Sequence, residues 1–234
     1  MRTVEIMVYQ FRELSENAKE KVLKKFREIN VENGTWYEST IDFWKEKLAE
    51  HGFNDAKIYF SGFWSQGDGA CFNADIDAYK AAKSLKFNEM ELRIIKLCNP
   101  YYKIETIDHH YVHSNTRSVS FEGYYNGPDD WDEFEKIINT PVNELPLLIG
   151  SFKEEFSKQL IEERIKSGLE VHANLLMYLE KSLEDVRYKL SNEIYRDLEK
   201  DYNYLISDKA VIDTIEINNL KFDKEGNIIR FNKK

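Results

Sequence analysis

The sequence predicts an α+β protein: a mixed or antiparallel β-sheet in the N-terminal half packed with helices, followed by a mainly helical C-terminal half with one long helix. Between residues 58 and 124, apolar and polar residues alternate with the period of two that is typical of strands. Elsewhere apolar residues recur at helical spacing, over the longest distance from residue 169 to 206. The strongest break is Asn126-Gly127-Pro128, so we expect a sheet domain over 1–127 and a helical region over 128–234. The helical region either packs with the sheet domain as one unit or forms a separate one.

The first half is predicted element by element. Residues 4–9 predict a strand, Ser15 is a good N-cap for a helix over 15–29, and a second helix over 36–50 ends at Gly52. Alternation over 58–64 and 71–78 predicts a hairpin. The segment 88–98 predicts a helix that begins with a capping box, and 101–112 with 117–124 predicts a second hairpin that turns near residue 114.

The second half predicts helices over 131–139, 147–166, 169–206 and 208–217, then a small terminal hairpin over 222–229. Apolar residues recur along the whole helix predicted over 169–206, and most of the stability of such a helix comes from packing its apolar face. We therefore expect it to pack on a partner helix or to form a homodimer with a second copy of the chain.

Composition restricts the class of protein. The chain has 234 residues and a net charge of −9, with −2 in residues 1–125 and −7 in residues 126–234. This argues against direct nucleic-acid binding, which favours basic surfaces. The acidic half suits a basic partner, mimicry of nucleic acid, or a solvated helical surface kept soluble by its charge. Apolar runs are too short to span a bilayer, the N-terminus has no signal-peptide pattern, and Cys71 and Cys98 are too few for a disulfide framework. We expect a cytoplasmic protein without membrane contact.

The loop Ser65-Gln66-Gly67-Asp68-Gly69 joins the strands of the first predicted hairpin. It lacks the lysine and hydroxyl of a P-loop, the third glycine of a dinucleotide fingerprint and the spacing of a nucleophile elbow. Two interpretations remain open. Backbone N–H groups around the glycines form an anion-accepting nest beside the stacking surfaces of Phe63 and Trp64, or Asp68 satisfies those N–H groups in a plain turn.

The histidines at 109, 110 and 113 predict no zinc site, because on a strand His109 and His113 lie about 13 Å apart and His110 points to the other face. His113 beside Ser114 and Thr116 is a candidate general acid/base, and a polar strand face is the competing interpretation. Asp75 and Asp77 suit either Mg²⁺ or a solvated face. We predict no metal and no cofactor.

Three stretches resemble a protein family common in phages and prophages. The most specific is the motif YFSGFWSQGDGACF over 59–72; the others are 111–116 and 194–202 with 207–211. The resemblance covers roughly residues 55–230. It implies a phage-encoded accessory protein that counters host defences, and it carries no catalytic residues over to this chain.

We therefore predict a non-enzymatic phage accessory protein in the bacterial host cell, which antagonises host defence by binding a nucleotide-like small molecule or a host defence protein. The candidate ligand-binding residues are Trp64, Ser65, Gln66, Asp68, His113, Ser114 and Thr116. Two alternatives are a phosphodiesterase or nuclease with His113 as acid/base near Asp68 or Asp75, and an antitoxin-like partner of a basic protein.

Overall fold

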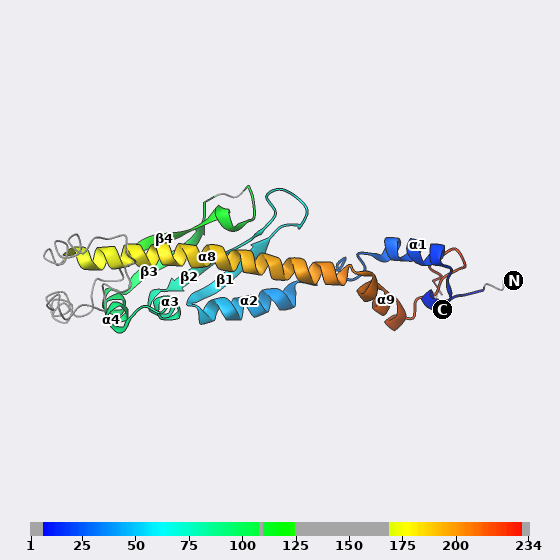
Figure 1. The fold of residues 1–234 in the computed structure, drawn as a ribbon, viewed down its shortest axis with the longest axis horizontal. Helices are drawn as coiled ribbons and strands as arrows, with labels where there is room; N and C mark the ends of the chain where they lie inside the picture. The colour runs from blue at the N-terminus through cyan, green and yellow to red at the C-terminus, as the bar shows by residue number, and fades with distance from the viewer. Residues whose placement is uncertain (1–6, 108–109, 125–168, 231–234) are drawn as a thin grey trace. The chain divides into compact units, whose positions relative to one another are not determined.

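A computed structural model describes residues 7–107, 110–124 and 169–230 (Figure 1). The chain divides into two compact units, one formed by Met1–Thr40 with Arg196–Lys234 and the other by Ile41–Tyr195. The division predicted near residue 127 and the helices predicted over 131–139 and 147–166 lie outside the described residues.

The unit of residues 41–195 contains a four-stranded antiparallel sheet. Its strands follow the order β1 (Phe53–Phe60), β2 (Ala70–Asp77), β3 (Pro100–Thr106) and β4 (Arg117–Tyr124). The two predicted hairpins are therefore neighbours in one sheet. Together with the helices this confirms the α+β class.

Two strands end earlier than the sequence predicts. β1 runs over 53–60 instead of 58–64, with an irregularity between Asn54 and Lys57 that interrupts the period of two. It ends at Phe60 because Ser61 N–H donates to Gly69 O at 3.0 Å and closes the loop. β3 ends at residue 106 instead of 112, where Ile107 N–H donates to Thr116 O.

Four helices belong wholly or largely to this unit: α2 (Glu38–Glu50), α3 (Ala78–Ser84), α4 (Glu89–Cys98) and α8 (Leu169–Leu205). The capping box of α4 forms as predicted, and α8 has the predicted length. α3 was not predicted: Asp77, expected on a strand face, accepts a hydrogen bond from Lys80 N–H and caps this helix. Gly52 has a φ of +86°, and a Cβ there would lie 2.7 Å from Ala81 N, so the turn after α2 requires glycine.

The core of this unit lies between one face of the sheet and the helices along it (Figure 1). The buried side chains of that sheet face include Phe72, Ile76, Tyr102, Ile104 and Val119. The helices contribute Trp44, Leu48, Ile94, Ile95, Leu175, Leu179 and Leu183. The hydroxyl of Tyr102 donates to Leu176 O of α8 at 3.0 Å, so this buried polar group keeps a partner.

The other unit is built from both ends of the described chain. It contains the short helix η1 (Phe11–Glu13), α1 (Glu16–Phe26) and α9 (Asp208–Ile217), around a core that includes Val22, Val211 and Phe222. Ser15 caps α1 as predicted, and Ser207 caps α9. The terminal hairpin is a single bridge between Phe222 and Ile228. Of the strand predicted over 4–9, residues 4–6 lie outside the described residues, and Tyr9 forms only one bridge, to Phe222.

Candidate functional site

The connections β1–β2 and β3–β4 lie against each other at one end of the sheet (Figure 1). We call residues 61–69 and 110–116 of these connections the loop pair. Ser61 Oγ accepts a hydrogen bond from Gly69 N–H at 3.2 Å and donates to Val112 O at 3.4 Å. A Cβ on Gly69 would lie 2.5 Å from the Cβ of His113, so only glycine allows this approach. Two motifs that are separate in sequence, over 59–72 and 111–116, thus form one surface.

Asp68 organises the first loop. Its Oδ2 accepts hydrogen bonds from the backbone N–H groups of Trp64 at 2.8 Å and Ser65 at 2.6 Å. The Ser65 bond is the largest cause of the lowered pKa of Asp68; together with bonds from Trp64 and Ser61 it outweighs the opposing effect of burial. The N–H groups of Trp64 and Ser65 are therefore bonded to the protein's own carboxylate. The position of Asp68 agrees with the turn interpretation.

The outer surface of the loop pair is aromatic and polar. Trp64 is 72% exposed and Tyr111 is 47% exposed, and Ser65 and Gln66 lie exposed between them in the chain. The Tyr111 ring packs on Gly67, whose φ is +99°, and stacks on the His113 ring at 6.0 Å between centroids. Two aromatic side chains from separate loops are thus presented by backbone that is already ordered.

Helix α8 supports the first loop from beneath. The Phe63 ring lies between Phe60, at 6.2 Å, and Tyr195 of α8, at 5.5 Å between centroids. The Tyr195 hydroxyl also donates to Gly62 O at 3.4 Å. These contacts orient Phe63 inward, so the two neighbouring aromatics of the motif have opposite roles: Phe63 packs and Trp64 faces solvent.

The remaining candidates, His113, Ser114 and Thr116, have structural bonds. His113 caps the short helix η2 (Ser114–Thr116): its Nδ1 accepts from Asn115 N–H at 3.1 Å, and its carbonyl accepts from Thr116 Oγ1 at 2.8 Å. The interpretation of His113 as part of a polar strand face is therefore wrong, because His113 lies directly before η2. Ser114 and Thr116 are buried.

The catalytic arrangement proposed from the sequence is not assembled in the described residues. There, no hydrogen bond joins His113 to Asp68 or Asp75, and Asp75 accepts from the Tyr101 hydroxyl at 3.2 Å. His110 is exposed, and His109 lies outside the described residues. No group of three or more His, Cys, Asp or Glu side chains suited to a metal ion is found in the part of the chain that the structure describes.

Sequence reasoning missed two buried arginines beside the loop pair. Arg187 of α8 is 2% exposed and forms an ion pair with Glu184, whose Oε2 lies 3.0 Å from Arg187 Nε. Arg187 also donates to Ser114 O, and Glu184 accepts from Val119 N–H at 2.9 Å. This group of bonds ties α8 to the start of β4 and to η2.

Arg117, the first residue of β4, is 7% exposed. Its Nε donates to Asn73 Oδ1 at 2.6 Å, and its Nη1 donates to the carbonyl and hydroxyl oxygens of Thr116 at 3.0 and 3.1 Å. The guanidinium carbon lies 5.3 Å from the centroid of the Tyr59 ring. In the sequence, Arg117 is marked only by its position directly after the motif over 111–116. The spacing of residues does not show that its charge is buried.

Comparison with known families adds one finding to this geometry. A family described as a domain of unknown function (DUF8835) matches residues 36–208. The chain belongs to this family. The match includes the whole sheet unit and the loop pair. Comparisons with curated proteins and with solved structures each gave no match. Across the described residues, the helices are each too short or too polar to cross a membrane.

Proposed function

We propose that this protein is a non-enzymatic binding protein whose recognition surface is the loop pair, and that its ligand is a nucleotide-like small molecule. The observation that carries the proposal is the contact between the two connections, which places exposed Trp64 and Tyr111 on one ordered surface. Aromatic faces bind bases by stacking without reading their edges, and each stacked base contributes about 1–3 kcal/mol.

The bonding of the candidate residues supports binding over catalysis. Asp68 is held ionised by backbone N–H groups, which disfavours a role as general acid near neutral pH. His113 uses Nδ1 to cap η2. Each of these polar groups therefore shapes the surface, while Trp64, Ser65 and Gln66 remain exposed to contact a ligand.

The biological setting is part of the same proposal. The motif over 59–72 resembles proteins of phages and prophages, and on that resemblance we propose an accessory protein that acts in a bacterial host cell and counters its defences. A nucleotide-like ligand suits this setting because removing a small signalling molecule by binding requires no catalytic residue.

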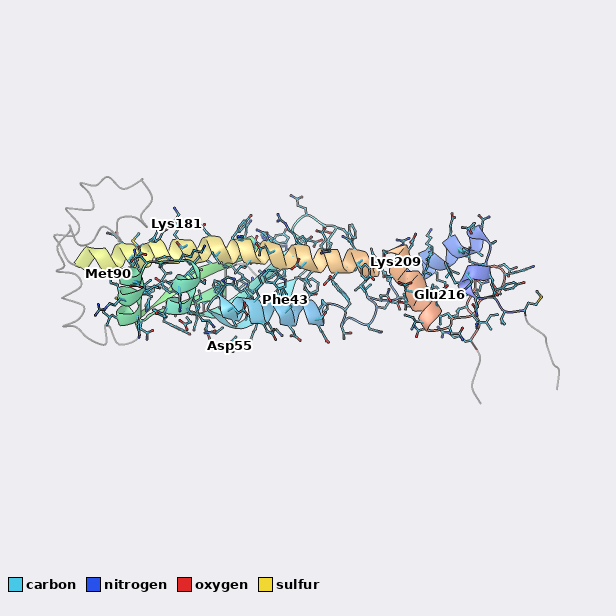
Figure 2. The ribbon with its side chains drawn as sticks, turned by 60° about the horizontal axis from the view of Figure 1, so that its bottom comes forward. Phe43, Asp55, Met90, Lys181, Lys209 and Glu216 are labelled. Atoms are coloured by element: carbon cyan, nitrogen blue, oxygen red, sulfur yellow. The ribbon has the colours of Figure 1, made fainter. Side chains whose placement is uncertain are left out.

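The first experiment is native mass spectrometry of the protein purified from a bacterial host. We expect an added mass of a few hundred daltons in the wild type and its loss in Trp64→Ala. The matched control is Phe43→Ala, because Phe43 is a 55% exposed aromatic on α2 (Figure 2). A bare chain in the wild type, followed by no binding of added nucleotides, would refute the proposal and direct attention to a host protein or a basic toxin as partner.

A further inference from the structure

The two buried arginines of the sheet unit differ in one respect. Arg187 has a carboxylate partner, Glu184, whereas Arg117 forms no ion pair with any residue that the structure describes. Burying a charge without a counter-charge is costly, and proteins normally pair such a group. Arg117 therefore lacks, among the described residues, the partner that its burial calls for.

The neighbours of Arg117 are neutral. Its bonds are to the amide oxygen of Asn73 and to two oxygens of Thr116, and one face of the guanidinium lies over the Tyr59 ring. The thiol of Cys71 is also close. Burial is the largest influence on that thiol and raises its pKa, although the charge of Arg117, a bond to Thr116 and the charge of Arg187 act in the opposite direction, so the thiol stays protonated at neutral pH.

One nitrogen of Arg117 remains available. Nε and Nη1 make the hydrogen bonds, while Nη2 makes none to any described residue. The whole residue is 7% exposed, and Nη2 is not fully sealed from solvent. The guanidinium is thus fixed by three hydrogen bonds and a ring contact, and the N–H groups of Nη2 have no described partner. A pre-oriented donor of this kind binds anionic oxygens with little loss of entropy.

We propose that Arg117 is the seat for an anionic phosphate group of the ligand, held by Nη2 beside the Tyr59 ring. This inference deepens the proposed function. It rests on that function for the base of the ligand, which stacks on the loop pair, whereas the phosphate seat itself depends only on Arg117. Arg117 follows Thr116 directly, so the seat adjoins the loop pair.

The charge of the surrounding unit makes the proposal specific. Residues 41–195 contain 18 lysines and arginines against 27 aspartates and glutamates. The unit as a whole repels anions, so phosphate binding would require a local site and would not reflect general attraction to a basic surface.

The test is isothermal titration calorimetry of the full chain at constant ionic strength with adenosine 5′-monophosphate, adenosine and inorganic phosphate. In the wild type we expect the monophosphate to bind roughly 10- to 100-fold more tightly than adenosine, the factor that a charged hydrogen bond supplies. In Arg117→Gln and Arg117→Lys the monophosphate should bind no better than adenosine. Lysine keeps the charge but lacks the separate nitrogens needed to hold Asn73, Thr116 and a phosphate together.

Lys83→Gln is the matched control. Lys83 is an exposed cation on α3 in the same unit, and its removal should leave the affinity unchanged. Circular dichroism reports whether each variant is folded. If Arg117→Gln is unfolded, Arg117→Lys and a phosphate-dependent rise in the melting temperature of the wild type carry the test.

The outcomes separate this inference from the proposed function. Equal affinities for the monophosphate and adenosine, or monophosphate binding that survives in both Arg117 variants, would overturn the seat while leaving a ring-binding surface intact. Phosphate binding that requires Arg117, without any gain from the adenosine ring, would support the seat and refute the nucleotide-like ligand. No binding of the monophosphate or phosphate at millimolar concentration would overturn the seat.

Discussion

Replacing Arg187 by methionine tests whether the bonds between α8, β4 and η2 hold the sheet unit together. Arg187 is 2% exposed, and its removal leaves Glu184 without its ion pair and removes the bond from Arg187 to Ser114 O. Breaking a fully buried ion pair costs about 3–5 kcal/mol. The Glu184 side chain is 39% exposed, so solvent screens part of its charge, and it keeps the bond from Val119 N–H. We therefore expect the free energy of unfolding to fall by about 2–4 kcal/mol.

This loss can be measured by urea unfolding followed by tryptophan fluorescence, with thermal melting as a second probe. At about 2–4 °C per kcal/mol for a protein of this size, the melting temperature should fall by roughly 5–15 °C. Lys181→Met is the control, because Lys181 is an exposed residue of the same helix, and its replacement should change stability by less than about 0.5 kcal/mol (Figure 2).

The double variant Arg187→Met with Glu184→Met sharpens the test. If the cost of Arg187→Met arises mainly from an unpaired Glu184 carboxylate, removing that carboxylate should restore part of the stability. A single variant within about 1 kcal/mol of the wild type would refute the reasoning. So would a double variant that is less stable than the sum of the two single changes predicts.

Three further predictions concern pH, packing and thiol reactivity. Burial raises the pKa of Glu184, but its bonds to Arg187 and to Val119 N–H and the Arg187 charge outweigh burial, so the folded-state pKa lies below the ordinary 4.5. The stability that this group contributes is therefore present above pH 4.5 and is lost as the pH falls through the lowered pKa. Urea unfolding at a series of pH values should show this loss in the wild type and little of it in Arg187→Met. Gly69→Ala should destabilise the protein by about 1–3 kcal/mol and weaken ligand binding, because the added Cβ overlaps the second connection. Gly62→Ala, which meets only the Asp68 side chain at 3.3 Å, should change the melting temperature far less, and equal shifts would contradict the close approach. Burial raises the pKa of Cys71 and raises that of Cys98 to about 11, so neither should react with a thiol reagent at pH 8 until urea unfolds the chain; fast labelling in the native state would disprove their burial.

Local features of this fold could be predicted because they depend on neighbours in the sequence. Ser15, Asn88 and Ser207 each cap a helix with the bond that their position predicts, since an N-cap side chain reaches only two or three residues ahead. The length of α8 and the start of β4 also follow from periodicity. The α+β class is the sum of such local signals.

The limits of the strands and the composition of the candidate site required the tertiary structure. Beyond the end of β1 at Phe60, Asp68 accepts hydrogen bonds from the backbone N–H groups of Trp64 and Ser65, where the sequence predicted a continuing strand. Helix α3 begins because Asp77 caps it. Both residues have side chains that suit either role, so their positions in the sequence do not select between the two.

By itself the sequence determined that the segments of α1, α2, α4, α8 and α9 form helices, where most of these begin, and which two motifs carry polar and aromatic residues. The tertiary structure alone decided that the motifs meet, that Phe63 packs inward while Trp64 is exposed, and that Arg117 is buried without a carboxylate among the described residues. The physical reason is that burial and charge pairing are properties of contacts between residues distant in the chain. A pattern of spacing records the face on which a residue lies, but it does not record what covers that face.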